Sequence, residues 1–275
     1  MRRFDCFMFN NELDMLECRL TELEDVIDHF VLVEATVTHG ANQPKPLHFQ
    51  ENQERFAKWS DQIVHVVADG MPSHVDPWSR EHAQREWFRT GLLSVDVQPD
   101  DIIFQSDVDE IPRTDFVKYT NPTGFVVAEM DFYCFALDWL NTESPDAPWR
   151  GTVAARYGFI ETFTKMRDAR LWAPVRVPDA GWHFTWVGGP EYWPSKLGSF
   201  CHPEIGPTVE RQGLGWYFEN GVHVDGFPCQ QVDHDDYPKW IREGHAPDSW
   251  WRFRLASPRN GSANNHRTHS QNLHR

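Results

Sequence analysis

Residues 100–113 read DDIIFQSDVDEIPR, and this stretch decides the fold class. Its apolar centre runs directly into Asp107, Asp109 and Glu110, and Pro112 then begins the next segment. A short apolar run bounded by turn residues is typical of a buried strand. In open α/β sheets, ligands bind beyond the carboxyl ends of such strands. The stretch therefore predicts a buried strand that carries carboxylates to a ligand-binding edge.

The residues before this stretch alternate between strand-like and helix-like patterns. We expect strands at 3–9, 27–35, 62–67 and 101–106. We expect helices at 13–25, where leucines recur at helical spacing, near 51–59, and over 79–95 with Ser79 as N-cap. This order is typical of βαβ units. The predicted fold class is α/β, with a Rossmann-like, mostly parallel central sheet flanked by helices.

The second half of the chain has a looser pattern. Residues 123–140 predict a pair of strands, and the later segments are short and punctuated by Pro and Gly. No internal repeat or linker divides the chain, so we expect one domain over 1–256 with an irregular C-terminal half. Apolar content collapses over 257–275, which predicts a disordered tail.

The composition excludes several classes of protein. With 26 Lys and Arg against 41 Asp and Glu, the formal net charge is −15, which disfavours a non-specific nucleic-acid binder. Hydrophobic residues make up 40% and charged residues 24%, as in soluble globular proteins. The 13 Trp and 19 Phe are mostly core candidates, although aromatic surfaces also suit sugar rings.

The sequence predicts a cytoplasmic location. The five cysteines, Cys6, Cys18, Cys134, Cys201 and Cys229, are odd in number and form no C-x-x-C pair, which favours reduced thiols. The N-terminal residues lack the apolar core of a signal peptide, and no apolar run approaches the roughly 20 residues of a membrane span.

The acidic turn after the predicted strand at 101–106 is a candidate metal site. Asp107 and Asp109 repel each other unless a cation lies between them, and Mn²⁺ or Mg²⁺ prefers such oxygen ligands. The cation would also neutralise a diphosphate that an acidic protein could not otherwise hold. The alternative is a solvated acidic turn. A zinc site from His223, Cys229 and His234 is disfavoured, because their spacing matches no recognised zinc motif.

Four segments carry a resemblance to a known family. They are FDCFMFNNELDMLECRL (4–20), FVLVEATVTHGANQPKPLHF (30–49), PDDIIFQSDVDEIPR (99–113) and AGWHFTW (180–186). In these segments the chain resembles glycosyltransferase family 17. The resemblance implies a GT-A fold, a UDP-sugar donor with N-acetylglucosamine as the leading sugar, a divalent metal on the D-x-D, and inversion at the anomeric carbon. It places the nucleotide-binding half at about 1–120 and the acceptor half at about 121–256.

The resemblance also assigns metal ligands. Asp107 and Asp109 match the D-x-D of the family, so we expect Asp109 to bind the metal directly and Asp107 to contact the metal or the ribose. His183 lies in the matching GWHF segment and is a candidate third ligand. The alternative for His183 is a core histidine beside Trp182. We expect a structural role for Glu110.

Three other residues are candidates for the nucleotide site. Glu34 ends a predicted buried strand and would contact uracil or ribose, with helix capping as the alternative. Arg85 precedes the D-x-D strand and would pair with the diphosphate, unless it lies on a solvated helix face. Asn10 follows the first strand and is a weaker candidate.

An inverting transfer needs a carboxylate that takes the proton of the acceptor hydroxyl. Glu161 is our first candidate for this base, because it follows a strand-like run and opens a helix-like one. Asp131 and Glu129 are its competitors, and an exposed surface carboxylate is the alternative for Glu161.

The sequence thus predicts a metal-dependent glycosyltransferase that moves a sugar from a UDP-sugar to a glycan hydroxyl. Two alternatives remain open: a non-catalytic carbohydrate-binding protein, and a metal-dependent phosphohydrolase that uses the same acidic turn. A parallel α/β start argues against the first, since such binding modules are usually all-β. The sequence identifies neither the acceptor nor the oligomeric state.

Overall fold

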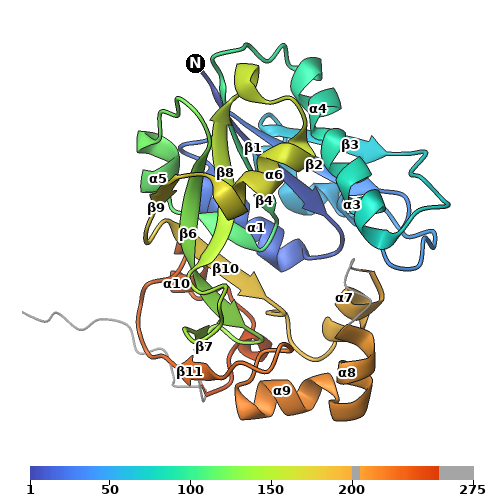
Figure 1. Cartoon of the computed structure of the whole chain (residues 1–275), viewed down its shortest axis with the longest axis vertical. Coiled ribbons are helices and arrows are strands. Elements are labelled where there is room, and N and C mark those ends of the chain that lie inside the picture. The colour runs from blue at the N-terminus through green and yellow to red at the C-terminus, as the bar shows by residue number, and fades with distance from the viewer. Residues whose placement is uncertain (200–204, 254–275) are drawn as a thin grey trace, which may run out of the picture.

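A computed structural model describes residues 1–199 and 205–253 of the chain. The four strands predicted in the first half are all present. They are β1 (Arg3–Phe9), β2 (His29–Ala35), β3 (Ile63–Ala68) and β4 (Ile102–Asp107). They pair in parallel in the order β4-β1-β2-β3 and form the upper part of the molecule in Figure 1. Their carboxyl ends therefore lie at one edge, where the acidic turn follows β4.

The sheet continues through the second half of the chain with antiparallel strand pairs. β8 (Trp149–Arg156) pairs antiparallel with β4, and β6 (Val126–Cys134) pairs antiparallel with β8. The short strands β7 (Trp139–Asn141) and β11 (Cys229–Gln231) extend this side. The central sheet is therefore mixed, which corrects the expectation of a mostly parallel one, while the predicted α/β class is confirmed.

A branch of the sheet connects the two halves at the acidic turn. β10 (Gly181–Thr185) runs parallel to β6 and antiparallel to β5 (Glu110–Pro112), and β9 (Val175–Val177) pairs with β6. In this register His183 lies opposite Glu110 on one side and Phe132 on the other. The branch thus carries His183 to the turn that holds Asp109.

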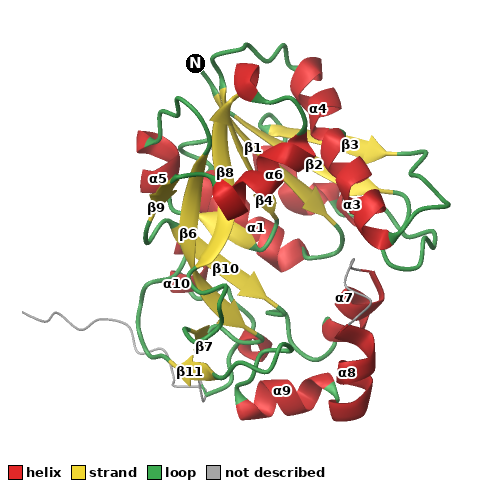
Figure 2. Ribbon diagram, viewed as in Figure 1, coloured by secondary structure: helices red, strands yellow, loops and turns green. Residues whose placement is uncertain are grey.

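Helices cover both faces of the sheet and form much of the lower part of the molecule (Figure 2). Those of the first half are α1 (Leu13–Leu23), α2 (His48–Glu51), η1 (Gln53–Trp59), α3 (Pro77–Glu86), α4 (Phe88–Ser94) and α5 (Thr114–Tyr119). Those of the second half are η2 (Tyr157–Phe159), α6 (Phe163–Trp172), α7 (Trp193–Ser199), α8 (Gly206–Gln212), α9 (Leu214–Asn220), α10 (Lys239–Arg242) and η4 (Asp248–Trp250).

The helix predicted over 79–95 is two helices, α3 and α4. Asp76, rather than Ser79, caps the first, because its carboxylate accepts a hydrogen bond from the Ser79 amide while Pro77 takes the first helical position. The break falls at Trp87, whose amide bonds to the carbonyl of Gln84 three residues back. No Gly or Pro marks this break in the sequence.

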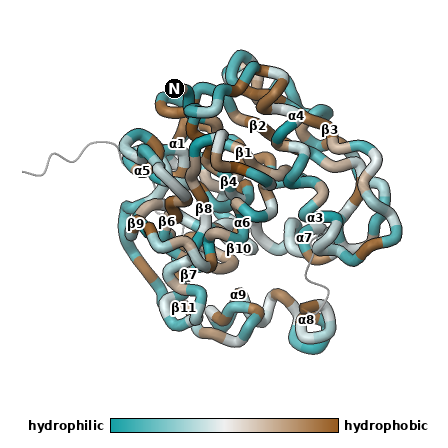
Figure 3. The backbone as a smooth tube through the Cα atoms, turned by 45° about the horizontal axis from the view of Figure 1, so that its top comes forward, coloured by the Kyte–Doolittle hydropathy of each residue, from teal (hydrophilic) through white to brown (hydrophobic). Residues whose placement is uncertain are grey.

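The core lies on the two faces of the sheet, where the hydrophobic strands gather in Figure 3. Adjacent side chains of a strand point to opposite faces. Accordingly, Phe104 packs with Leu16 and Leu20 of α1, while Ile103 packs with Phe88 of α4 on the other face. The strand that ends in the acidic turn is therefore buried on both sides and holds the turn in place.

Some predictions fall on residues that the structure does not describe. The tail predicted at 257–275 and Cys201 both lie outside the described residues. The other four cysteines are free thiols, as predicted. Across 1–199 and 205–253, the helices are all too short or too polar to span a bilayer. The division into a nucleotide half and an acceptor half stays a prediction.

Replacing Gly181 tests how closely β10 packs on β5. A Cβ at Gly181 would lie 2.5 Å from the backbone oxygen of Ile111 and 3.0 Å from Cα of Pro112. We expect Gly181→Ala to lower the free energy of unfolding by about 1–3 kcal/mol, as overpacking does. Gly124→Ala is the matched control, because a Cβ there meets nothing within 4 Å. Urea unfolding measures both, and equal stability of the two variants would contradict this packing.

Candidate active site

A cavity of about 550 Å³ opens at the carboxyl ends of the parallel strands. Its walls come from β1, β4, α3, α6 and β10, and from the segment around α7 and the turn after α9. Five of the predicted site residues line it: Asn10, Arg85, Asp107, Asp109 and His183. The volume lies within the ~300–1,000 Å³ of typical small-molecule sites.

Two arginines hold Asp107 from opposite helices. Arg85 of α3 lies 2.8 Å from Asp107 Oδ1, and Arg167 of α6 lies 2.8 Å from Asp107 Oδ2. Burial favours a higher pKa for this carboxyl, but the charges of Arg167 and Arg85 outweigh it and hold the pKa well below its usual range. Asp107 is therefore an anion whose two oxygens are both already bonded.

The same Arg167 joins the turn to its neighbouring strand. It lies 2.6 Å from Oε1 of Glu110, a fully buried carboxylate that also accepts hydrogen bonds from Trp149 Nε1 at 2.7 Å and from the Asp107 amide at 3.0 Å. This confirms the structural role expected for Glu110. Arg167 thereby pairs with the carboxylates at both ends of the Asp107–Glu110 turn.

Asp109 faces the cavity from the other side of the turn. Its Oδ2 accepts a hydrogen bond from Nζ of Lys196 on α7 at 2.9 Å. Its Oδ1 lies 3.9 Å from Nε2 of His183. Burial favours a lower pKa for Lys196, but Asp109 outweighs it and raises that pKa. Lys196 therefore stays charged beside Asp109.

His183 stands between two aromatic rings. It stacks on Phe132 with ring centres 5.1 Å apart and on Trp149 with ring centres 4.3 Å apart. Burial lowers its pKa to about 4, so the imidazole is neutral near pH 7. Its Nδ1 is buried and finds no hydrogen-bond partner within 1–199 and 205–253, while Nε2 faces Asp109. The aromatic neighbours agree with the core-histidine alternative, but the cavity contact gives His183 access to a ligand.

The residues at this point fit a hard divalent cation. A carboxylate oxygen of Asp109 and the neutral Nε2 of His183 face each other at the cavity wall. Carboxylate oxygens suit Mn²⁺, and a neutral imidazole is a common metal ligand in proteins. The two oxygens of Asp107 instead point to the arginines, so Asp109 and His183 are the better-placed pair.

Of the three residues predicted for the nucleotide site, two line the cavity and one does not. Arg85 is 2% exposed and lines the cavity, so the alternative of a solvated helix face is wrong. Its Nη1 is buried and has no hydrogen-bond partner in the part of the chain that the structure describes. Asn10 also lines the cavity and donates a hydrogen bond to Ser199 Oγ at 3.0 Å.

Glu34 does not line the cavity, and this finding corrects the nucleotide contact that we expected for it. Its carboxylate accepts a hydrogen bond from the Phe49 amide at 3.1 Å, in the first turn of α2. His65 lies 3.2 Å and Lys45 3.7 Å from the same carboxylate. Its carboxylate thus caps a helix, which is the alternative stated for it, and it also pairs with Lys45.

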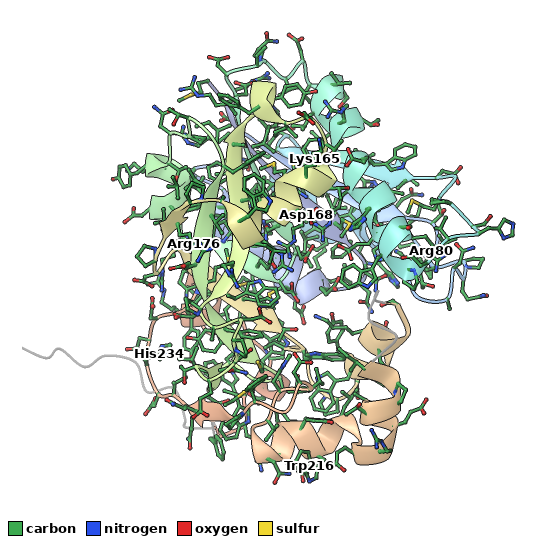
Figure 4. All side chains as sticks on the ribbon, viewed as in Figure 1. Arg80, Lys165, Asp168, Arg176, Trp216 and His234 are labelled. Carbon is green, nitrogen blue, oxygen red and sulfur yellow. The ribbon has the colours of Figure 1, made fainter. Side chains whose placement is uncertain are left out.

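None of the three candidate bases, Glu161, Asp131 and Glu129, lines the cavity. Glu161 precedes α6, is 74% exposed at its side chain and pairs with Lys165 on the outer surface. The ion pair with Lys165 lowers the pKa of Glu161. Its position is that of the surface carboxylate given as the alternative. Figure 4 shows Lys165 on α6.

Asp131 also points away from the cavity, because it alternates on β6 with Phe132, which lines it. Asp131 instead forms an acidic cluster with Asp179 and Asp236 around Arg113, which lies 3.7 Å, 2.7 Å and 2.5 Å from their carboxylates. Burial raises the pKa of Asp131. One arginine therefore already pairs with all three carboxylates of this cluster.

Sequence reasoning gave no role to several cavity residues, among them Arg167, Lys196 and Asp225, and it considered His223 only for a disfavoured zinc site. The first two lie on helices far from the D-x-D in sequence, and nothing in their local pattern indicates an ion pair with it. His223 and Asp225 lie in the irregular segment after α9. A histidine two residues before an aspartate is too common a pair to indicate a site.

The comparisons with known proteins agree on one family. A family model described as glycosyltransferase family 17 matches residues 1–190. The chain is 31% identical over 94% of its length to a rat protein named β-1,4-mannosyl-glycoprotein 4-β-N-acetylglucosaminyltransferase. Mouse and human proteins of the same name are 30% identical over 94% and 32% identical over 86% of the chain. The chain spans 55%, 55% and 52% of the three relatives.

Removing Arg167 tests the ion network of the turn. We expect Arg167→Met to lower the free energy of unfolding by about 3–5 kcal/mol, because it leaves the buried Glu110 charge without a cation. Lys165→Met on the same helix removes only an exposed pair and is expected to cost about 0–1 kcal/mol. Urea unfolding compares them. A loss for Arg167→Met no greater than for Lys165→Met would refute the structural role of the network.

Proposed function

The chain belongs to glycosyltransferase family 17, and on that premise we propose that it moves N-acetylglucosamine from a UDP-sugar to a glycan hydroxyl, with a divalent cation and with inversion at the anomeric carbon. Membership of the family makes it a glycosyltransferase, so the carbohydrate-binding and phosphohydrolase alternatives are not retained. The donor, the metal and the stereochemistry are the parts that we propose.

The observation that carries the proposal is the pairing of Asp109 with His183 at the cavity wall. A carboxylate and a neutral imidazole lie 3.9 Å apart and are both reached from the cavity, and such a pair suits Mn²⁺ better than Mg²⁺, which prefers oxygen ligands alone. When bound there, the cation would neutralise the diphosphate of the donor and stabilise the charge that grows on the leaving UDP.

The cavity also offers the chain's own cations to an anionic donor. Five basic residues line it, although the net charge of the protein is −15. They are Lys45, Arg85, Arg167, Arg170 and Lys196. Among the described residues Nη1 of Arg85 has no hydrogen-bond acceptor, and a phosphate or uridine oxygen would supply one. Lys196 would exchange its contact with Asp109 for one with the diphosphate.

The relatives supply the finer part of the proposal. Their names specify transfer of N-acetylglucosamine to a β-1,4-mannosyl glycoprotein. We extend the sugar to this chain, and a β-mannoside is the first acceptor to test. The alignment spans about half of each relative, so the acceptor of this chain is to be identified by experiment.

Replacing Asp109 tests the metal site. We expect Asp109→Ala to lose Mn²⁺ binding measured by calorimetry in the presence of UDP, and to lose Mn²⁺-dependent release of UDP from UDP-N-acetylglucosamine. Asp179→Ala removes an exposed carboxylate outside the cavity and is the control. Full Mn²⁺ dependence in the Asp109 variant would refute the assignment.

Replacing Glu161 and Asp131 tests whether either carboxylate, although outside the cavity, acts as the base. Because neither Glu161 nor Asp131 lines it, we expect Glu161→Gln and Asp131→Asn to keep kcat within about threefold of the wild type. Rates of UDP release at saturating donor measure this. A loss of about 10²-fold or more in either variant would restore that residue as the base.

A further inference from the structure

We propose that His39 recognises the base of the donor. Its ring nitrogen Nδ1 accepts a hydrogen bond from N3–H of uracil, and the protein thereby selects a uridine nucleotide over a cytidine nucleotide. The inference rests on the proposed function and deepens it, because it names a residue that determines which nucleoside is bound. Three observations support it: the side chain that fixes the tautomer of His39, the contacts that hold its loop, and the end of the cavity at which it lies.

A chain of hydrogen bonds determines which nitrogen of His39 carries the proton. Nε2 of Gln84 donates to the carbonyl oxygen of Val33 at 2.9 Å, and a carbonyl oxygen can only accept. The other end of this amide, Oε1 of Gln84, lies 2.6 Å from Nε2 of His39. An amide oxygen is also only an acceptor, so Nε2 of His39 carries the hydrogen and donates it.

Nδ1 of His39 is consequently a hydrogen-bond acceptor. Burial lowers the pKa of His39, so the ring is neutral near pH 7. In a neutral imidazole one nitrogen donates and the other accepts. Within 1–199 and 205–253, the ring makes its hydrogen bond to Gln84 through Nε2 and none through Nδ1. Because His39 is partly exposed and lines the cavity, Nδ1 is left for a ligand that brings an N–H or O–H group.

The position of His39 is fixed by neighbours on both sides of its loop. Residues 36–45 fold back as a hairpin. Near its tip, the buried Arg80 of α3 donates to the carbonyl of His39 at 2.6 Å and to that of Gly40 at 3.1 Å. The amide of His39 donates to the carbonyl of Ser199 on α7 at 3.1 Å. Figure 4 shows Arg80 on α3. The imidazole is therefore held in place before a ligand arrives.

The cavity extends from the D-x-D turn to this hairpin. β4 carries Asp107, β2 leads into the hairpin, and β1 lies between these two strands. Adjacent strands are about 4.8 Å apart, so the ends of β4 and β2 are roughly 10 Å apart across the sheet. A nucleotide whose diphosphate lies beside Asp109 would thus extend over the end of β1 and bring its nucleoside to His39.

The opposite end of the cavity suits a sugar better than the base. Phe132 and Trp149 line it, and both come from the antiparallel part of the sheet. Aromatic side chains of this kind suit the apolar faces of sugar rings. In open α/β sheets, by contrast, nucleotides bind beyond the carboxyl ends of parallel strands, which is where the hairpin of His39 lies. We therefore assign the nucleoside to the hairpin and the acceptor sugar to the aromatic end.

Uracil has the donor that an acceptor at this position requires. N3 of uracil carries a hydrogen, whereas N3 of cytosine carries a lone pair that would face the lone pair of Nδ1. A site built to bond a donor group rejects an analogue without that group, because the acceptor of the site is then left unpaired. Ribose hydroxyls are donors as well, so the test includes an analogue of the ribose.

The test measures the affinity of the full chain for UDP, CDP and 3-methyl-UDP by calorimetry with Mn²⁺. The methyl group of 3-methyl-UDP replaces the hydrogen on N3. We expect the wild type to bind UDP about 5–100-fold more tightly than either analogue, the loss typical of an acceptor left unpaired. His39→Phe keeps a ring but has no acceptor, so the affinities for UDP and CDP should agree within about threefold.

Two further variants separate recognition from structure. His82→Phe is the matched control, because His82 lies on α3 and also lines the cavity, and it should keep the wild-type preference for UDP. Gln84→Met removes the acceptor that fixes the tautomer, so the ring of His39 can also present Nδ1–H to N3 of cytosine. We expect the affinity for CDP to rise relative to that for UDP in this variant. Melting temperatures close to that of the wild type establish that each variant is folded.

The outcomes distinguish the two proposals. If the wild type binds UDP but binds both base analogues equally well, or if His39→Phe or Gln84→Met keeps the full preference, the role of His39 is overturned and the proposed function stands. Loss of the preference in His82→Phe would overturn it too. If 2′-deoxy-UDP alone binds weakly, Nδ1 meets the ribose and recognition of the base is wrong. If the wild type neither binds UDP with Mn²⁺ nor releases it from UDP-N-acetylglucosamine, the proposed function itself fails.

Discussion

The ion pairs of Arg167 with Asp107 and Glu110 are the interaction on which the site depends. Glu110 is fully buried, and a buried carboxylate is costly unless a cation and hydrogen-bond donors surround it. Arg167 supplies the cation from α6, and Trp149 of β8 and the Asp107 amide supply donors. A helix, an antiparallel strand and the D-x-D turn are thus joined at one point. The direction of Asp109 into the cavity is set by that junction.

The two aspartates of the D-x-D have different surroundings and therefore different uses. Asp107 is neutralised by two arginines of the protein, and Asp109 by a single lysine beside a neutral histidine. Two positive charges on one carboxylate form a permanent structural unit, whereas one flexible lysine is a partner that can be exchanged. The motif thus combines a structural anchor and the proposed metal ligand within three residues.

The sequence predicted the parts of the fold that local patterns determine. Continuous apolar runs predicted β1 to β4, and the acidic turn at the end of β4 was found from the same run. Patterns could not place Glu34, because a buried carboxylate after a strand has the same sequence signal whether it caps a helix or binds a ligand. They also favoured Glu161 as a base, because a carboxylate at a helix start is visible in sequence while its exposure is not.

The remaining site residues depend on contacts between distant segments. Arg167 meets Asp107 only because β8 is reversed and places α6 across the edge of the sheet, and the mostly parallel arrangement that the pattern predicted would not show this. His223 and Asp225 reach the cavity through a turn after α9, in a segment without hydrophobic periodicity. In such segments long-range packing, rather than local preference, decides where a side chain lies.

The ammonium group of Lys196 on Asp109 has a consequence for which ions the protein admits. A tethered cation that already satisfies the carboxylate must be displaced by any ion that enters, and a monovalent ion gains too little from a single carboxylate to displace it. Under the proposed function, a doubly charged ion that arrives with a nucleotide would gain from both the carboxylate and the phosphates, and the freed ammonium group would gain a phosphate in turn. Lys196 would thereby prevent sodium and potassium ions of the surrounding solution from binding at Asp109.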